Sequence, residues 1–296
     1  MIVSTLIPAY NSESTIERAI QSVLSQKVPQ SELIVVDDGS SDRTSAKVRR
    51  YGKKVRYIRQ KNQGVSAARN LGLRLARGRF IAFLDADDQW LPGKLRHQME
   101  AFERYPSAMV VSTGVNYLEE DGRLARVYSR ELRGKVFDDF LEGNFIVTSS
   151  AVLRRDCLRG VPRPFFPPGV FYGEDYAFWL KLAARHEFYA SPKVLVNYTQ
   201  PSDRSFLKKF SERGMTESYR AVIRVAQAYC GPDGIRKLRS RQRLEIASIH
   251  ARKGKWGKTL WESLAAFWMK PWSWTNILWH FQNAKLLLRN FRMTKG

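Results

Sequence analysis

The sequence predicts an α/β fold with a mostly parallel central sheet, helices on both faces of the sheet and a helical carboxy-terminal region. Over residues 1–115, short continuous apolar runs alternate with segments of helical periodicity. This alternation is typical of strands that are buried on both faces of a parallel sheet. From about residue 202 the pattern is helical throughout. A chain of 296 residues with 44% hydrophobic and 26% charged residues can bury a sizeable core, which excludes a disordered chain or a small disulfide scaffold.

The first half contains five expected strands separated by helices. The first strand is β-branched and stops at Pro8, as a buried strand bounded by a turn residue does. A side chain at residue 11, 12 or 14 can cap the helix that ends near residue 26, and Asp42 can cap the helix that ends near residue 50. Pro92 suits the start of the helix that ends near residue 105. The strands are expected at residues 2–7, 33–36, 55–58, 80–84 and 108–115, and the helices end near residues 26, 50, 76 and 105.

The periodicity is less regular after residue 115. A proline-rich loop is expected at residues 162–169 and a helix at residues 175–184. Further strands are expected at residues 123–128, 148–153 and 194–198.

The charge is strongly positive and uneven. The chain holds 50 Lys/Arg and 28 Asp/Glu, a net of +22, and residues 201–296 alone hold 20 and 6, a net of +14. A basic carboxy-terminal third indicates an anionic partner, which is a nucleic acid, an acidic membrane surface or a phosphate-bearing substrate. The alternative is that the basic side chains have no partner and only keep the helices of this region soluble.

Targeting features are not visible in the sequence. The apolar stretch at residues 2–7 is too short for a signal peptide and lacks a basic leader. No window offers 18 uninterrupted apolar residues, and Cys157 and Cys230 are expected as buried thiols of a reducing compartment. The expected location is the cytosol, where the protein can rest on a membrane.

An acidic run, Asp85-Ala86-Asp87-Asp88, closes the fourth strand. Residues two apart in a turning segment can project to the same side, so Asp85 and Asp87 can hold one divalent cation through carboxylate oxygens. Mg²⁺ or Mn²⁺ held in this way keeps positions open for phosphate oxygens. The alternative is an acidic turn that caps the following helix.

Two further acidic clusters follow apolar or loop segments. Asp37 and Asp38 end the second strand, where a carboxylate can accept hydrogen bonds from a ribose hydroxyl or a base N–H, although an Asp-Gly turn is the simpler interpretation. Glu174 and Asp175 open a later helix, where a carboxylate is either a capping residue or a general base. A metal-bound diphosphate, a bound nucleoside and an activated acceptor hydroxyl together describe nucleotide-sugar chemistry.

Four motifs follow one another in order over residues 7–88. They are Ile-Pro-Ala-Tyr-Asn at 7–11, Val-Val-Asp-Asp-Gly-Ser-Ser-Asp at 35–42, Asn-Gln-Gly-Val-Ser-Ala-Ala-Arg-Asn at 62–70 and Phe-Leu-Asp-Ala-Asp-Asp at 83–88. Their order and spacing, with Gly-Glu-Asp at 173–175, resemble the family 2 glycosyltransferases. The resemblance covers about residues 1–200, and it implies the Rossmann-like GT-A fold and an inverting mechanism.

The resemblance implies roles for residues of a nucleotide-sugar pocket. Pro8 and Tyr10 match positions that line the nucleotide, with Tyr10 packed on the base. Asp38, or its neighbour Asp37, matches the carboxylate that reads uracil. Three more positions match the loop and helix beside the sugar nucleotide: Asn62, Gly64 and Arg69.

The same resemblance implies the metal and catalytic positions. Asp87 matches the direct metal ligand, and Asp85 matches a residue near the ribose and sugar, with Ala86 between them. Asp175 matches the catalytic base, with Glu174 as its neighbour. The implied cofactor is Mn²⁺ or Mg²⁺.

One departure from the family pattern concerns processivity. Processive members carry Gln-x-x-Arg-Trp after the base, together with membrane spans, and the sequence has neither. Residues 197–205 instead resemble the mobile segment that nonprocessive members close over the diphosphate. Arg204 is the expected phosphate clamp there, the alternative being a solvated loop arginine.

The last 41 residues are rich in tryptophan and basic side chains. This mixture suits a membrane interface with anionic headgroups, and the alternative is a helical hairpin whose aromatic side chains pack inside the protein. Six of the eight tryptophans are in this stretch: Trp256, Trp261, Trp268, Trp272, Trp274 and Trp279.

The sequence therefore predicts an inverting, metal-dependent, nonprocessive glycosyltransferase of cell-envelope polysaccharide biosynthesis. Its expected donor is a nucleotide sugar, in the first place a UDP-sugar, and its acceptor is a hydroxyl of a glycan or lipid-linked acceptor. The expected partners include an anionic membrane surface but no nucleic acid, and the expected location is cytoplasmic or peripheral on the cytoplasmic face of the inner membrane. The expected domains are a catalytic domain at 1–200, with nucleotide-sugar-binding (1–115) and acceptor-side (116–200) halves, and a helical region at 201–296.

Two rival functions remain at this point. One is a noncatalytic nucleotide-sugar-binding or scaffold protein that keeps the fold. The other is a sugar nucleotidyltransferase, which needs a Gly-rich loop with a basic residue after the first strand, whereas Pro8, Ala9, Tyr10 and Asn11 stand there.

Overall fold

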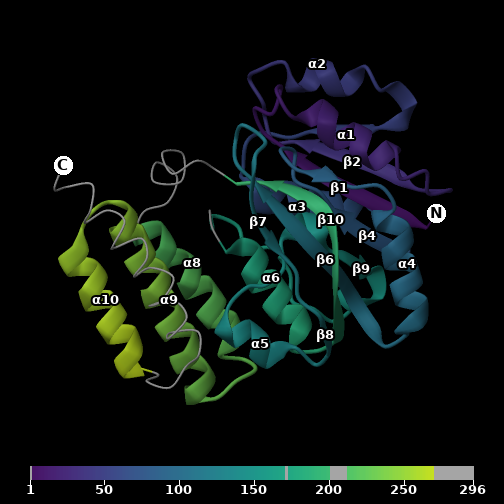
Figure 1. Ribbon diagram of the computed structural model, residues 1–296. Helices are drawn as coiled ribbons and strands as arrows, with labels where there is room; N and C mark the ends of the chain where they lie inside the picture. Colours follow the sequence, from purple (N-terminus) through teal and green to yellow (C-terminus); the bar gives the residue numbers. More distant parts are fainter. Residues whose placement is uncertain (1, 171–172, 201–211, 270–296) are drawn as a thin grey trace. The chain divides into compact units, whose positions relative to one another are not determined.

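The computed structural model describes residues 2–170, 173–200 and 212–269 (Figure 1). The chain divides into two compact units. One comprises Met1–Phe140 and Asn144–Ser202, and the other comprises Leu141–Gly143 and Asp203–Gly296.

The first unit is an α/β unit. Its strands are β1 (Val3–Ala9), β2 (Glu32–Asp37), β3 (Arg56–Arg59), β4 (Phe80–Phe83), β5 (Gln89–Trp90), β6 (Ala108–Leu118), β7 (Leu124–Tyr128), β8 (Leu132–Gly134), β9 (Val152–Arg154) and β10 (Glu187–Thr199). Its helices are α1 (Ile16–Leu24), α2 (Thr44–Arg49), α3 (Val65–Leu75), α4 (Lys94–Arg104), most of α5 (Phe137–Glu142) and α6 (Glu174–Ala183).

All ten strands form one sheet, in the order β3-β2-β1-β4-β9-β6-β10-β5, with β7 beside β6 and β8 beside β10. The pairings across β3, β2, β1 and β4 are parallel, as predicted. Beyond β4 the sheet is mixed, because β9 runs antiparallel to both β4 and β6. The register sets Ala9 opposite Asp37 and Leu6 opposite Phe83. The carboxyl ends of β1, β2 and β4 therefore meet at one edge, where ligands bind in sheets of this kind.

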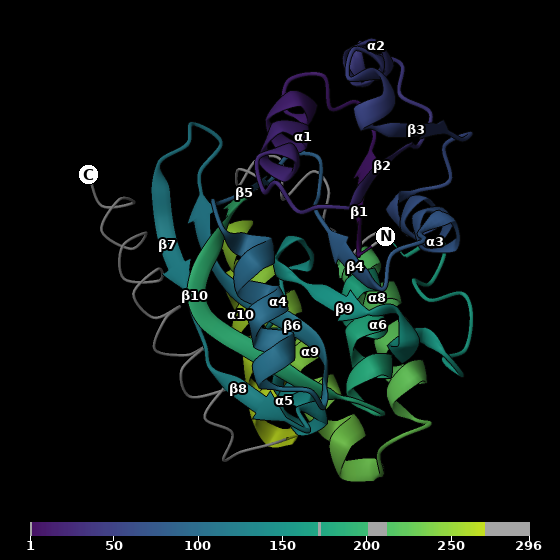
Figure 2. The ribbon, with the colours of Figure 1, turned by 90° about the vertical axis from the view of Figure 1, so that its right-hand side faces the viewer.

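Helices cover both faces of the sheet, as predicted (Figure 2). On one face, Ile20 of α1 and Phe102 of α4 join a core cluster with alternate strand residues such as Ile7. On the other face, the ring of Phe83 contacts that of Trp179 on α6, with ring centroids 5.8 Å apart. Successive side chains of the buried strands point to opposite faces of the sheet, so the same strands contribute to the core on both faces.

The second unit is helical in the described residues. Its helices are α8 (Glu212–Ala226), α9 (Pro232–Arg252) and α10 (Trp256–Met269), and α9 packs against both of the others (Figure 1). Leu238 of α9 and Val222 of α8 are fully buried. None of the helices that the structure describes has the length and hydropathy needed to cross a membrane.

Several predicted boundaries differ from the structure. The strand expected at residues 148–153 is a 3₁₀ turn at Thr148–Ser150 followed by β9, because Ala151 N–H bonds back to the Thr148 carbonyl at 3.1 Å. The short β5, β8 and α5 are not predicted by the sequence. The last strand, β10, begins well before the predicted residue 194, since Pro192 and Lys193 interrupt its apolar pattern.

Helix caps differ in a similar way. The first helix has no side-chain cap, and the Ser12 carbonyl accepts from the Ile16 N–H instead. The N-cap of α2 is Arg43 rather than the predicted Asp42, although the Asp42 carboxylate, one residue earlier, accepts the Thr44 N–H at 2.9 Å. α4 begins two residues after Pro92, behind the left-handed Gly93.

Candidate active site

The loops that follow β1 and β2 are joined at the carboxyl edge of the sheet. Asp38 N–H donates to the Ala9 carbonyl at 2.8 Å, and Asn11 N–H donates to Ser40 Oγ at 3.0 Å. These bonds hold Tyr10, whose side chain is 52% exposed, beside the turn that contains Asp38. An exposed ring in this place is available to stack on a planar ligand.

The two neighbouring carboxylates after β2 have different partners. Asp37 is fully buried and accepts hydrogen bonds from Ser40 N–H at 2.8 Å and from Tyr57 O–H at 2.5 Å. Asp38 accepts from the side chain of Gln60 and from the backbone N–H of Gly64, both at 2.7 Å. Asp37 therefore stabilises its own turn, whereas Asp38 fixes the loop that leads into α3.

That loop contains the predicted Asn62 and Gly64. Asn62 is exposed, and Gly64 has φ +88° and precedes the first residue of α3. Gly39, at φ +80°, lies so close that a Cβ there would stand 2.9 Å from the Asn62 backbone nitrogen. A glycine is needed at this point because both its conformation and this close approach exclude a side chain.

The acidic loop after β4 is anchored through its last carboxylate. Asp88 is fully buried and accepts from Ser149 Oγ at 2.5 Å and from Thr199 N–H at 3.0 Å. Burial, and then the charges of Asp87 and Asp85, raise the pKa of Asp88 well above its ordinary value. Asp88 thus ties the loop to the 3₁₀ turn and to the end of β10, and it leaves the two preceding aspartates at the sheet edge.

Asp85 and Asp87 offer an all-oxygen donor set for a cation. Asp87 is exposed, Asp85 is half-buried and Ala86 between them is buried. Within residues 2–170, 173–200 and 212–269, no group of three or more His, Cys, Asp or Glu side chains has the arrangement of a metal site. The carboxylates of Asp85 and Asp87 nevertheless fit a hard divalent ion, because such an ion takes oxygen ligands and keeps part of its water shell. Their negative charge, which raises the pKa of Asp88, would be neutralised by such an ion.

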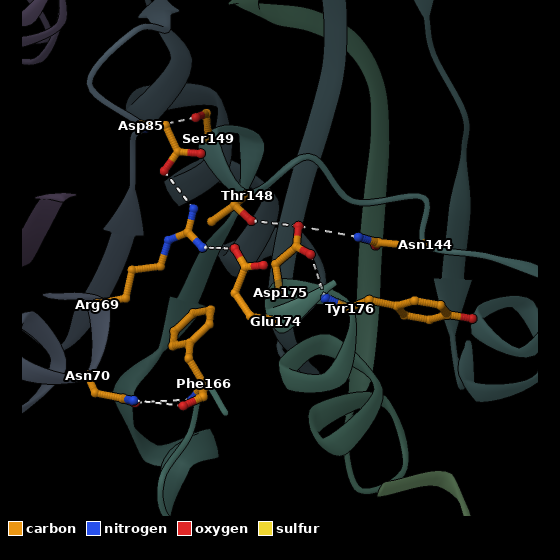
Figure 3. Close-up of polar contacts among 10 residues, drawn as sticks. All are labelled: Arg69, Asn70, Asp85, Asn144, Thr148, Ser149, Phe166, Glu174, Asp175 and Tyr176. Carbon is orange, nitrogen blue, oxygen red and sulfur yellow. Dashed lines mark hydrogen bonds and ion pairs between the residues drawn. The ribbon is translucent and has the colours of Figure 1, made fainter. Parts of the chain in front are cut away.

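Arg69 joins this acidic loop to α6 (Figure 3). Its guanidinium bonds to Asp85 Oδ1 and to Glu174 Oε1, each at 2.7 Å, and it is only 4% exposed. Burial acts to lower the pKa of Arg69, but Asp85 and Glu174 more than offset burial and raise it. The ring of Phe166 packs beneath, 5.4 Å from the guanidinium carbon. Arg69 therefore stays charged and links the predicted metal loop to Glu174, the neighbour of the predicted base.

Asp175 lies at the start of α6, next to Glu174 (Figure 3). One carboxylate oxygen accepts from the Tyr176 N–H at 2.7 Å, and the other accepts from Thr148 Oγ1 at 3.1 Å and from Asn144 Nδ2 at 3.4 Å. Burial, and then the charge of Glu174, raise the pKa of Asp175 to about 7. A carboxylate with this pKa is able to accept a proton near neutral pH.

The structure brings four of the residues singled out in the sequence into one cluster. Asp85, Arg69, Glu174 and Asp175 form one chain of contacts (Figure 3), and Pro8 is half-buried near the end of β1. Arg204 and the tail residues Trp272, Trp274 and Trp279 lie outside the described residues.

Several partners of the site were not predicted. Thr148, Asn144 and Ser149 are far from the acidic motifs in sequence and have no local signal there. Asp88 stands inside the predicted Asp-Ala-Asp-Asp run, which could have indicated its role. Arg18 of α1 donates to the Asp87 carbonyl at 2.6 Å, a contact that only the packing of α1 reveals.

A buried carboxylate with a raised pKa, beside an acidic loop at the carboxyl edge of a sheet, is typical of an enzyme active site. The chain belongs to the glycosyl transferase family 2, whose model matches residues 4–161. The GT-A α/β fold and the helical carboxy-terminal region predicted from the sequence are confirmed.

Named relatives match between 61% and 65% of the chain. The putative teichuronic acid biosynthesis glycosyltransferase TuaG of Bacillus subtilis is 33% identical over 61% of this chain and 71% of its own length. WfaP of Escherichia coli, a UDP-Glc:α-D-GlcNAc-diphosphoundecaprenol β-1,3-glucosyltransferase, is 33% identical over 62% of this chain and 71% of its own length. An uncharacterized glycosyltransferase of Rickettsia felis is 32% identical over 65% of this chain, and the match spans 32% of that protein.

Solved structures of S. aureus TarS share the fold. One aligns with a TM-score of 0.61 at 20% identity and covers 89% of this chain and 45% of that protein. A complex of TarS 1–349 with UDP-GlcNAc aligns with a TM-score of 0.58 at 15% identity, over 93% of both chains.

Proposed function

We propose that the protein is an inverting, metal-dependent, nonprocessive glycosyltransferase. It transfers a sugar from a nucleotide-sugar donor to a hydroxyl group of a glycan or lipid-linked acceptor. In this proposal Asp175 is the general base that takes the proton of the acceptor hydroxyl, and the carboxyl edge of β1, β2 and β4 binds the donor.

The observation that carries the proposal is the short chain of contacts from Asp85 through Arg69 to Glu174, next to Asp175. It couples a loop suited to a diphosphate to a carboxylate with a pKa of about 7. Buried carboxylates with shifted pKa values are concentrated at catalytic sites. This favours an enzyme over a scaffold protein that has kept the fold without the chemistry.

Asp87 and Asp85 are the residues that would hold Mn²⁺ or Mg²⁺. When bound, such an ion stabilises the negative charge of a departing nucleoside diphosphate. Arg69 occupies Asp85 Oδ1 and leaves its second oxygen for a ligand. The Ser149 and Thr199 contacts to Asp88 hold the loop in place, so the chain itself positions these carboxylates.

The donor and the acceptor are proposed from the relatives together with the site. The name of WfaP describes a glucosyltransferase that uses UDP-Glc and a diphosphoundecaprenol-linked sugar. WfgD of Escherichia coli is described in the same words. A UDP-sugar is consistent with exposed Tyr10 beside Asp38, where a planar base can stack. Asp38 is then the carboxylate that reads the base, and its bonds to the Gly64 loop position it for this role.

The test is sugar transfer from UDP-sugars to a lipid-diphosphate-linked sugar, with and without Mn²⁺. Asp175→Asn keeps the size of the side chain but removes the proton acceptor. It should retain UDP binding by calorimetry and lose turnover by ~10²–10⁴-fold, the usual contribution of a general base.

The matched control is Asp138→Asn, which changes an exposed aspartate in the first turn of α5. This variant should transfer at the wild-type rate. Near-normal turnover of Asp175→Asn would assign the base to another group, with Glu174 the first to examine.

The remaining expectations are part of the same proposal. The residue ranges 1–115, 116–200 and 201–296 are proposed as the nucleotide-sugar-binding half, the acceptor-side half and a helical accessory region. A cytoplasmic location and contact with an anionic membrane surface through the helical region are proposed with them, because a lipid-linked acceptor lies at such a surface.

A further inference from the structure

Helix α10 of the second unit has its small side chains buried and its large apolar side chains exposed. The buried positions are spaced four and three apart and form one stripe: Thr259, Ser263 and Ala266. The exposed large positions form a second stripe: Leu260, Trp261, Leu264, Phe267 and Trp268. This is the reverse of the usual surface helix, in which the apolar stripe faces the core.

The buried stripe holds α10 firmly against α9. Ser240 of α9 donates its hydroxyl to the Ala266 carbonyl at 3.1 Å. Arg243 of α9 pairs with Glu262 at 2.8 Å, and this pair neutralises the one acidic residue of α10. Small residues at a helix contact allow a close approach of the two backbones, a pattern that is typical of helices packed within lipid.

The exposed stripe is large for a surface in contact with water alone. Trp268 is 83% exposed and Trp261 is 69% exposed. Burial of such side chains is favourable, and a contiguous apolar patch on a protein surface marks a contact with a partner or a membrane. Because α9 occupies the other side of α10, the described residues of the second unit leave this stripe exposed to its surroundings.

The charges next to the stripe identify those surroundings. Lys253, Lys255 and Lys258 stand exposed at the start of α10. The following sequence, residues 270–296, contains further Lys and Arg and no Asp or Glu. Tryptophan side chains flanked by basic residues suit the headgroup region of an anionic bilayer, and each Lys or Arg near such a surface strengthens binding by roughly fivefold.

We propose that α10 lies flat in the interface of an anionic lipid bilayer, with the Leu260–Trp268 stripe in the acyl boundary and the α9 side facing the protein. This inference assigns the membrane contact proposed above to one face of one helix. It does not depend on the chemistry of the first unit, so it can stand or fail separately from the proposed transferase activity.

Flotation of the full chain with lipid vesicles tests the proposal. The vesicles are phosphatidylcholine alone and phosphatidylcholine with added phosphatidylglycerol. Trp268→Ser should lower the partition coefficient on anionic vesicles by roughly tenfold, because full burial of one large apolar side chain is worth about that factor. The double variant Trp261→Ser/Trp268→Ser should lose more.

The matched control is Leu124→Ser/Val127→Ser, which removes two exposed apolar side chains from β7. It should float like the wild type. Both tryptophans are exposed, so the variants should keep the wild-type melting temperature and UDP affinity, and a loss of flotation is then specific to the stripe.

A charge variant separates the two parts of the contact. Lys253→Gln/Lys255→Gln/Lys258→Gln should weaken binding to anionic vesicles on the order of a hundredfold and leave binding to neutral vesicles nearly unchanged. Equal flotation of the wild type and the tryptophan variants would overturn the proposal. So would a wild-type dimer in sedimentation velocity that dissociates in Trp268→Ser without any lipid binding, since the stripe would then pair with a second copy.

Discussion

Replacement of Arg69 by methionine is the sharpest test of the link between the acidic loop and α6. The guanidinium is 4% exposed and makes two ion pairs at 2.7 Å. Methionine keeps an apolar side chain of similar length, but it removes the guanidinium that lies over the Phe166 ring and leaves Asp85 and Glu174 without their cation. Removal of one partner from a buried pair costs ~3–5 kcal/mol of the free energy of unfolding. For a unit of about 200 residues this lowers the melting temperature by about 6–20 °C.

The same substitution should move the pH dependence of transfer. Arg69 acts to lower the pKa of Asp175, so the loss of Arg69 should raise that pKa further. The rising limb of kcat/KM against pH should then shift to higher pH in Arg69→Met. Arg69→Lys, which keeps the charge without the two-pronged geometry, should shift the limb less than Arg69→Met.

Thermal unfolding and a kcat/KM profile across pH 5–9 measure the two effects. A matched control is Arg123→Met, because Arg123 pairs with Asp121 at 2.6 Å while both side chains are largely exposed, and exposed pairs contribute about 0–1 kcal/mol. An Arg69→Met protein that melts at the wild-type temperature and keeps the wild-type pH profile would refute the assignment of Arg69 as the link.

Three further predictions concern single residues. The folded-state pKa of Asp175 is raised to about 7, so ionisation of Asp175 destabilises the fold as pH rises from about 4 to 7. Asp175→Asn should therefore raise the melting temperature at pH 8 but hardly change it at pH 4. An equal change at both pH values would contradict this. Asp87→Ala should abolish the Mn²⁺ dependence of UDP affinity in calorimetry, and a variant that stays metal-dependent would exclude Asp87 as a ligand. Gly39→Ala should lower the free energy of unfolding in denaturant by ~1–3 kcal/mol, because the new Cβ adds a close contact with Asn62 to an unfavourable φ. Gly122→Ala, at φ +84° with open space around it, should lower the free energy of unfolding by less. Equal losses in the two variants would show that the close approach to Asn62 is unimportant.

Local sequence patterns were sufficient to predict the first half of the fold and the polar clusters at one edge of its sheet. β1, β2 and β4 contain apolar runs that are followed by residues typical of turns, such as Asp38 and Asp85, whereas β3 has only Tyr57 and Ile58 between two arginines. In a parallel sheet these ends share one edge, so the clusters could be placed together without knowledge of the packing. The start of α6 at Glu174–Asp175 was predicted in the same way, because acidic residues before an apolar helix are a local signal.

The mixed half of the sheet and the partners of the proposed catalytic residues depended on tertiary structure. β9 is three residues long, too short to have a periodicity, and its antiparallel place between β4 and β6 sets the Thr148–Ser150 turn beside Asp85 and Asp175. Arg69 and Glu174 are separated by 105 residues, and nothing near either one indicates the other.

The same division holds for the charge state of Asp175 and for the tail. The sequence alone determined that a carboxylate begins α6, that the carboxy-terminal third is basic and that it carries most of the tryptophans. Only the packing decided that burial beside Glu174 raises the pKa of Asp175, and that Trp261 and Trp268 of α10 face outward while Ser263 and Ala266 face α9. The physical reason is that the desolvation of a side chain and the orientation of a helix depend on which surfaces pack together. The sequence determines that packing only through the whole fold.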